Sequence, residues 1–295
     1  MTENASTMSE VVYYHHPTDP RLSIDYVNPR LEEAEKHLSG KTNDEICRIE
    51  EYDLNGSVYI VYSGYEIPNA ANDLDFDIQA EVQDMEWANK IITTRILSLF
   101  ESVIDEKFEE ENEKLAAYKQ IEVDRIPEAL NRVSWGDSVT QTAGELVSCL
   151  ILRHALPNAN HRTSLGMLSL YYQSISPQFE MPATATEEYD WESWVNSFIE
   201  ESKRLITVRR NTIRFEYLKG FGCNVVERKD GLRIHLNEFD LDMPPRKAQS
   251  HYGKIHTRRS IQFAETVLRE AGTTQLQKGR PLDKEEFAER LQDME

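Results

Sequence analysis

The chain has 295 residues, of which 52 are acidic and 33 are basic, giving a formal net charge of −19. This length supplies enough apolar material for one large domain or two smaller ones. An acidic surface repels nucleic-acid phosphates, so we expect no nucleic acid among the partners. The first ten residues are polar, and no apolar run approaches the ~20 residues that span a bilayer. We therefore expect neither a signal peptide nor a membrane partner.

The cysteines favour a reducing compartment. Cys47, Cys149 and Cys223 lie far apart, form no CxxC pair and are odd in number. This pattern is typical of free thiols, and we expect a cytoplasmic protein in which Cys149 is a small buried hydrophobe. The excess of acidic residues, with arginine more frequent than lysine, also suggests adaptation to salt.

The N-terminal quarter of the chain predicts a small α+β region. Residues 1–20 show no periodicity and are expected to form a flexible lead-in. A short helix is expected over 31–38. Residues 46–52 and 58–65 flank Asn55-Gly56, which predicts a β-hairpin.

The next segment turns helical. From 76 to 118, apolar residues recur at spacings of three to five, which predicts helix with one break because the run is long and lacks caps. Seven acidic residues between 101 and 114 indicate a solvated helix face rather than a metal site.

The run 146–172 is the most informative part of the sequence. Its first apolar stretch predicts a buried helix that ends near His154, because Pro157 disfavours helical geometry in the residue before it. A second apolar stretch predicts another helix, and a polar turn with two histidines, two asparagines and Arg162 joins the two. The N–H groups that open a helix lack helical partners, so this turn is suited to an anion. The alternative is a turn that merely caps the two helices.

The C-terminal part is expected to be mixed. A long helix is predicted over 187–217, a second hairpin over 223–227 and 232–236, and two amphipathic helices over 255–271 and 283–294. The long helix has a basic stretch that either forms a solvated face or binds an acidic partner or nucleotide phosphates: Arg204, Arg209, Arg210 and Arg214. Three histidines show no metal-ligand spacing and are expected to be surface or structural residues: His235, His251 and His256.

The motif resembles the signature of the Fic/Doc (Fido) family, His-x-Phe-x-Asp/Glu-Gly/Ala-Asn-Gly/Lys-Arg. The matching positions are His154, Ala159, Asn160 and Arg162, with Leu156 in place of phenylalanine, and Thr163 fits the Doc-like branch. The resemblance implies a mainly α, Fido-like helical core over 76–220. It would lie between the lead-in 1–20 with the α+β region 21–75 and a C-terminal region 221–295 of hairpin and helices.

The resemblance also implies a nucleotide-dependent transferase that modifies a hydroxyl of a target protein, with ATP or another nucleoside triphosphate and Mg²⁺ as cofactors. His154 would be the general base, since an ordinary histidine pKa of ~6.5 leaves the ring mostly neutral near pH 7. The residues expected around the nucleotide are Asn158, Ala159, Asn160, His161, Arg162 and Thr163. Among them, Arg162 would pair phosphate oxygens, and the Asn160 amide would donate to one. Residues 118–126 would be the flap on which the target docks.

Two positions depart from the family pattern. Asn158 stands where the family has a magnesium-binding acid, so the metal affinity is expected to be lower. His161 stands where glycine is typical of AMP transfer and lysine of Doc-like phosphotransfer. The bulk of His161, with Leu165 in place of the family's second arginine, favours Doc-like phosphotransfer. The alternative is a non-catalytic Fido-like module that binds a nucleotide or a protein. In a toxin-like or regulatory system, an antitoxin or inhibitor protein would be a further partner.

Overall fold

The computed structural model describes residues 11–41, 45–65, 78–111, 119–188 and 190–294. The chain divides into two compact units. The first unit comprises Met1–Glu66 and Lys203–Tyr252, and the second comprises Ile67–Ser202 and Gly253–Glu295. Two long helices, α7 (Ser193–Gly220) and α8 (Pro245–Glu270), each contribute residues to both units. The sequence predicts boundaries after residues 20, 75 and 220.

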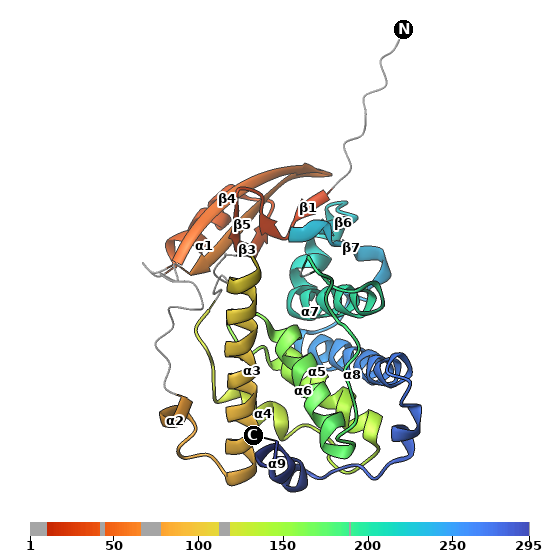
Figure 1. Cartoon of the computed structure of the whole chain (residues 1–295). Helices are drawn as coiled ribbons and strands as arrows, with labels where there is room; N and C mark the ends of the chain where they lie inside the picture. The colour runs from red at the N-terminus through yellow and green to blue at the C-terminus, as the bar shows by residue number, and fades with distance from the viewer. Residues whose placement is uncertain (1–10, 42–44, 66–77, 112–118, 189, 295) are drawn as a thin grey trace. The chain divides into compact units, whose positions relative to one another are not determined.

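The first unit contains a four-stranded antiparallel sheet. Its strands are β2 (His15–His16), β3 (Asp19–Asn28), β5 (Gly56–Tyr65) and β4 (Glu45–Leu54), in that order. Helix α1 (Leu31–Ser39) packs against this sheet (Figure 1). The predicted hairpin is confirmed, because Leu54 pairs with Gly56. Gly56 has a φ of 111°, a conformation that glycine adopts without steric cost.

A three-stranded sheet completes the first unit. Strand β6 (Val225–Glu227) lies between β1 (Val11–Tyr13), with which it is parallel, and β7 (Arg233–His235), with which it is antiparallel. The β6–β7 pair confirms the second predicted hairpin, and the 3₁₀ turn η2 (Lys229–Gly231) joins its strands. Another 3₁₀ turn, η3 (Leu236–Glu238), follows β7.

The predicted mainly α fold class is wrong. The structure is 57% helical and 16% strand, with two sheets, and is therefore mixed α+β. Strands β1, β2 and the start of β3 lie in the segment that was expected to be a flexible lead-in, of which residues 1–10 lie outside the described part. Two physical reasons account for the difference. Pro20 lies near the start of β3, where a strand tolerates proline, and β1 pairs with β6, far away in the sequence.

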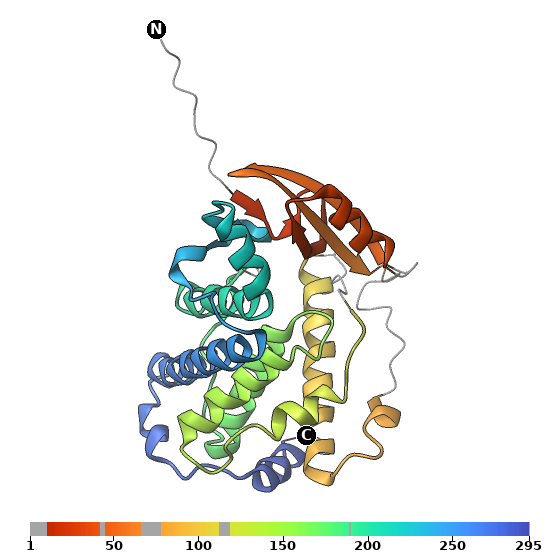
Figure 2. The ribbon, with the colours of Figure 1, turned by 180° about the vertical axis from the view of Figure 1, so that it is seen from behind.

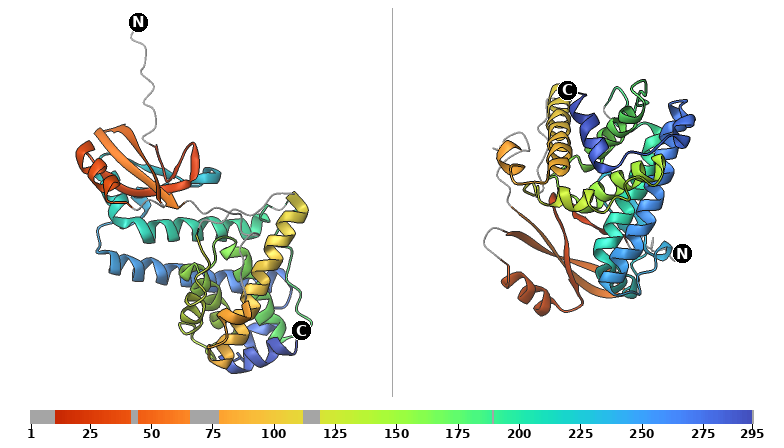
Figure 3. Two further views of the ribbon diagram at one scale, coloured as in Figure 1. Left: turned by 90° about the vertical axis from the view of Figure 1, so that its left-hand side faces the viewer. Right: turned by 90° about the horizontal axis from the view of Figure 1, so that it is seen from below.

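The second unit is helical. It contains α2 (Ile78–Glu81), α3 (Trp87–Glu111), α4 (Arg125–Leu130), α5 (Val139–Arg153), α6 (Asn160–Ile175), the 3₁₀ turn η4 (Thr274–Lys278) and α9 (Lys284–Gln292). Helix α3 lies alongside α6 and α9, as the view from below in Figure 3 also shows. Helices α5 and α6 lie side by side (Figure 2). The break expected within 76–118 falls between α2 and α3.

Aromatic packing and caps stabilise these helices. Phe263 of α8 stacks on Trp194 and Phe198 of α7, with ring centroids 5.8 and 4.2 Å apart. The Ser138 side chain caps α5, and Asp283 and Glu286 form a capping box at α9. In the parts of the chain that the structure describes, no helix has both the length and the apolar character needed to cross a bilayer.

Candidate functional site

The motif folds as the predicted helix–turn–helix, and both ends of its turn have unusual backbone geometry. His154 follows the last residue of α5 with φ 50° and ψ 51°, and Ala159 precedes α6 with φ 54° and ψ 15°. In the described ranges, these are the two non-glycine residues with positive φ. A left-handed conformation costs an L-residue about 1–2 kcal/mol. Such strain persists where the surroundings fix it, and it is concentrated at functional sites.

Asn160 holds the turn closed. Its buried side-chain amide accepts a hydrogen bond from the N–H of Leu156 at 3.2 Å and donates to the carbonyl of Leu156 at 3.0 Å. The second amide hydrogen reaches the carbonyl of Asn158 at 3.2 Å. Both N–H donors of the Asn160 amide are therefore directed at the turn itself. This arrangement gives Asn160 a positioning role in place of the expected donation to phosphate.

The turn does not offer a magnesium site. The Asn158 side-chain oxygen accepts from the N–H of Ala159 at 2.7 Å, and its charge is zero. Two carboxylates of the neighbouring segment are in ion pairs: Glu122 with Lys119 and Arg125, and Glu128 with Arg153. No three His, Cys, Asp or Glu side chains converge as metal ligands in the described part of the chain. A hard cation prefers charged oxygen ligands, so these residues do not fit bound Mg²⁺.

Thr163 lies behind the turn. Its side chain is buried, and its hydroxyl makes no hydrogen bond. It lines a small cavity with Leu156, Asn160 and Ser164, whose volume of about 10 Å³ corresponds to a single water molecule. The cavity is too small for a nucleotide, and its presence leaves the predicted role of Thr163 at a nucleotide a prediction.

Arg162, in the first turn of α6, lies over an indole ring. Its guanidinium carbon lies 4.4 Å from the centre of the Trp191 ring. Trp191 precedes α7, in a short hairpin-like segment where it pairs with Ala185. A cation over the face of an indole ring is attracted by its π-electrons, so this contact helps to hold Arg162 in place.

His161 belongs to a buried chain of hydrogen bonds. Its Nε2 lies 2.9 Å from the Ser202 hydroxyl of α7, which lies 2.7 Å from Nε2 of His256 in α8. Nδ1 of His256 lies 2.8 Å from the Ser148 hydroxyl of α5. His256, Ser148 and Ser202 are at most 1% exposed. The structure therefore places His256 in the core, whereas His235 and His251 are exposed.

The segment expected to be a docking flap lies beside the turn. The N–H of Glu122 donates to the carbonyl of Ala155 at 2.9 Å. Residues 119–124 contain no strand, and α4 begins at Arg125. Tyr118 lies outside the described residues. An extended flap is therefore not present in residues 119–126, although the segment does border the motif.

A family model matches residues 8–295, which is nearly the whole chain. Its description is "Family of unknown function (DUF8172)". The chain belongs to this family. No curated protein and no solved structure matches. Membership of DUF8172 does not indicate Fic/Doc membership, so the resemblance of the motif to that family stays a prediction.

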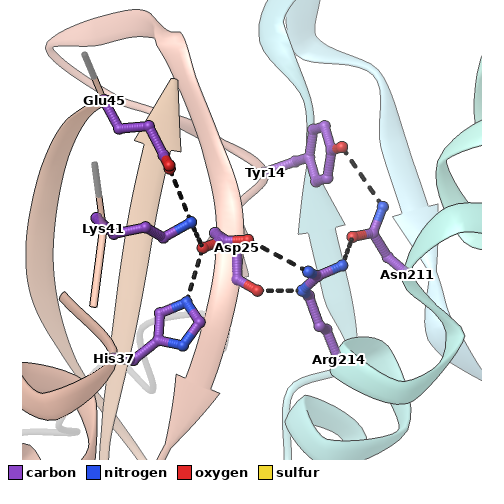
Figure 4. Close-up of polar contacts among 7 residues, drawn as sticks. All are labelled: Tyr14, Asp25, His37, Lys41, Glu45, Asn211 and Arg214. Carbon is purple, nitrogen blue, oxygen red and sulfur yellow. Dashed lines mark hydrogen bonds and ion pairs between the residues drawn. The ribbon is translucent and has the colours of Figure 1, made fainter. Parts of the chain in front are cut away.

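The first unit of this DUF8172 chain contains a charged cluster that the sequence did not indicate. Asp25 of β3 binds Lys41 at 2.6 Å and His37 at 2.8 Å on one side, and Arg214 of α7 at 3.4 Å on the other (Figure 4). Lys41 also binds Glu45 at 2.9 Å. Burial raises the pKa of Asp25, but the hydrogen bonds from Lys41 and His37 and the charges of Lys41 and Arg214 outweigh it and lower the pKa overall.

Three arginines of the basic stretch in α7 make contacts within the fold, and one of them, Arg214, belongs to this cluster. Arg214 binds Asp25 and donates to the Asn211 side chain at 3.0 Å, next to the non-helical backbone of Asn211. Arg204 and Arg209 donate to the carbonyls of Arg233 and Gln249, both at 3.0 Å. These contacts favour a structural role for the three arginines over a binding face.

The sequence missed several residues that shape the motif, and it misjudged a cysteine. Trp191 and Ser202 contact Arg162 and His161 only through folding, and Ser148 contacts His256; their spacing in the sequence gave no signal. Cys149 is half-buried rather than buried, and burial raises its pKa to about 11. All three cysteines are free thiols.

Proposed function

We propose that the turn 154–159 and the first turn of α6 bind the phosphate groups of a nucleotide, and that the protein is a Fido-type transferase. The observation that carries this proposal is the start of α6. It begins after Ala159, which has no side chain able to cap the helix. The first N–H groups of an α-helix have no partner within the helix and carry a partial positive charge. A phosphate oxygen is a suitable partner for them.

His154 follows the end of α5, and Arg162 lies in the first turn of α6. His154 would take a proton from a hydroxyl of the target protein. The hydroxyl oxygen then attacks a phosphorus atom of the nucleotide and breaks its bond to the leaving group, which is ADP in γ-phosphate transfer and pyrophosphate in AMP transfer. Arg162 and the helix start would neutralise the phosphate charge. The Doc-like direction, transfer of the γ-phosphate, is favoured over AMP transfer by the side chain of His161 in place of glycine.

The second candidate function is nucleotide binding without transfer. It is favoured by Asn158, whose neutral oxygen already accepts from the N–H of Ala159. Without a carboxylate for Mg²⁺, the site has binding groups but lacks a group that Fido enzymes use for transfer. The two candidates share the phosphate site and differ in the reaction.

The test is incubation of the protein with γ-labelled and α-labelled ATP and a cell lysate as the source of target, at low and high salt. Label from γ-labelled ATP alone on a protein indicates phosphotransfer, and label from α-labelled ATP indicates AMP transfer. His154→Ala and His154→Gly should both abolish transfer and keep ATP binding. The glycine variant tolerates positive φ, so it separates loss of the base from distortion of the turn.

Binding is measured by calorimetric titration with ATP. Arg162→Ala should weaken it by about 1.5–3 kcal/mol, the value of a charged hydrogen bond. Arg269→Ala, which removes one positive charge at the end of α8, is the matched control and should bind like the wild type. Equal affinity in the wild type and Arg162→Ala would contradict the phosphate site. ATP binding without transfer, unchanged in Asn158→Asp with added Mg²⁺, would leave the binding module as the function.

A further inference from the structure

Helix α8 has a row of basic side chains along one exposed face. Its members follow one another at spacings of four, three and four residues, which places them on the same side of an α-helix: Lys247, His251, Lys254 and Arg258. All four are exposed. They belong to one uninterrupted helix, whose own geometry sets their spacing, and at a rise of 1.5 Å per residue the row is about 16 Å long. We call these four residues the basic row of α8.

This row is unusual in an acidic chain. Residues 243–264 contain five lysines and arginines and no acidic residue, whereas the whole chain has a net charge of −19. Within the described ranges, no residue of the basic row forms an ion pair with a carboxylate. By contrast Arg259, on another side of the same helix, pairs with Glu201 at 2.7 Å. The basic row is therefore accessible to an acidic surface of a partner.

Helix α3 has an exposed acidic face of similar dimensions. Glu101, Asp105 and Glu109 follow one another at spacings of four residues, so their row is about 12 Å long. The ring of Phe108, which is 43% exposed, lies on the same side of the helix. These four residues form the acidic face of α3, and its carboxylates make no ion pair with any residue that the structure describes.

The carboxylates of this face repel one another. Partial burial and the charge of Asp105 raise the pKa of Glu101. A row of cations placed opposite the acidic face would relieve this repulsion, and the exposed ring of Phe108 would gain an apolar contact.

We propose that the basic row of α8 in one molecule docks on the acidic face of α3 in a second copy of this chain. The two faces have opposite charge and comparable length, and both are exposed. Opposite charges attract at contact distance, whereas at physiological salt the repulsion between two chains of net charge −19 is screened beyond about 8 Å. Because the two faces differ, the contact is heterologous, and copies join head to tail.

A nucleic acid fits the basic row less well. Duplex DNA carries one negative charge per about 1.7 Å, which is far more charge than four side chains neutralise, and it would bring this charge against an acidic chain. The acidic face of α3 instead presents a few carboxylates at helical spacing. A contact between two helices buries less area than a stable interface needs, so we expect association that grows with protein concentration.

The test is sedimentation equilibrium of the full chain over a range of protein concentrations. At about 0.15 M salt the average mass of the wild type should rise above the 34.2 kDa of one chain, and at about 1 M salt it should return to that value. Lys254→Glu with Arg258→Glu should lower the association constant by roughly tenfold or more, since attraction is replaced by repulsion. The control, Lys278→Glu with Arg290→Glu, makes the same charge change at exposed positions outside α8 and should associate like the wild type.

Charge reversal of both faces tests which two faces meet. Asp105→Lys with Glu109→Lys makes the α3 face basic, so this variant has two basic faces, whereas the α8 variant has two acidic ones. Each variant alone should stay at the mass of one chain. An equimolar mixture of the two should associate again, because every face then meets one of opposite charge. Recovery in the mixture also shows that both variants are folded.

Four outcomes would overturn the proposal. The first is a wild type that stays at the mass of one chain at every concentration, and the second is a mixture of the two variants that does the same. The third is association that is lost in the α8 variant but kept in the α3 variant, which would give the basic row another acidic surface as its partner. The fourth is binding of labelled duplex DNA that the α8 variant loses, in a wild type that does not self-associate, which would assign the row to nucleic acid.

Discussion

Two residues in the motif turn adopt a backbone conformation that only glycine adopts at no cost. His154 and Ala159 together store about 2–4 kcal/mol if each left-handed residue costs about 1–2 kcal/mol. The Asn160 amide offsets this strain with three hydrogen bonds to the turn. The position of His154 relative to the start of α6 therefore depends on Asn160.

The three hydrogen bonds between the Asn160 amide and the turn can be tested by removing the amide. Asn160→Ala leaves the buried N–H and carbonyl of Leu156 unpaired, which should cost about 1–3 kcal/mol of unfolding free energy. Asn160→Asp keeps the acceptor but places a carboxylate oxygen against two carbonyls, so it should destabilise at least as much. Urea unfolding gives the free energy, and hydrogen exchange of the Leu156 amide gives the local effect. Asn196→Ala, which removes a half-buried amide in α7, is the control. The Leu156 amide should lose its protection in the two Asn160 variants and keep it in the wild type and in Asn196→Ala. Equal protection of this amide in all four proteins would contradict the role of Asn160 in holding the turn.

At the scale of single residues, the sequence indicated where the turn lies but not what each side chain does. Pro157 and the two apolar stretches were enough to predict the helix ends. The hydrogen bonds of Asn160 depend on the path of the turn, and those of His161 depend on Ser202, which also contacts His256. Because these partners come from other helices, no spacing within the motif could have revealed them.

At the scale of helices, α5 and α8 pack so closely that one glycine decides the contact. A Cβ added to Gly144 would lie 2.4 Å from Cα and 2.6 Å from N of Ile261. Those atoms belong to the backbone of α8 and cannot move alone. Gly166 of α6 differs, because its added Cβ would meet only side-chain atoms of Leu99, the nearest at 3.1 Å.

The two glycines form a matched pair for a stability measurement. Alanine is a better helix former than glycine by about 1 kcal/mol, and this favours both substitutions. In Gly144→Ala the clash should outweigh that gain and destabilise the protein by about 1–3 kcal/mol, a typical cost of overpacking. Gly166→Ala should be neutral or stabilising. Thermal unfolding followed by tryptophan fluorescence is suitable, because all four tryptophans lie in the second unit. Similar unfolding temperatures for both variants would refute close α5–α8 packing.

Local pattern was sufficient for most helices and for both hairpins, since each depends on neighbouring residues. It failed for β1 to β3, and with them for the fold class. Strand β3 mixes polar and apolar residues and contains Pro20, and β1 gains its partner only from Val225–Glu227. The pairing of β1 depends on residues far away in the sequence, and the spacing of apolar residues within β1 gives no information about them. The start of α7 was placed too early for a related reason, because Trp191 continues the apolar stripe but lies in a bridge to Ala185.

For the whole molecule, the net charge of −19 and the local titrating groups have opposite effects as the pH falls. Protonation of exposed carboxylates reduces long-range repulsion, which salt also screens. Locally, burial and the charges of Arg228 and Lys229 lower the pKa of His15 to about 3. An unfolded chain would bind a proton at this residue below about pH 6.5, whereas the folded chain would not. Its contribution to stability is therefore complete above that pH and is lost towards pH 3.

This balance predicts how stability changes between pH 7 and 4.5 when salt has screened the long-range repulsion. The lowered pKa of Asp25 has its effect only below its unfolded value of 3.8, so His15 dominates in this window. The free energy of opening of the first unit should fall by up to ~1.4 kcal/mol per pH unit, the value for one proton. In His15→Phe, which keeps a buried ring without a titrating group, the slope of stability against pH should be close to flat.

Hydrogen exchange of the β3 amides measures this slope. Tryptophan fluorescence would not report on it, because the first unit contains no tryptophan. His235→Phe, on an exposed position of β7, is the control and should keep the wild-type slope. An equal slope in the wild type and His15→Phe would show that the acid sensitivity comes from other groups.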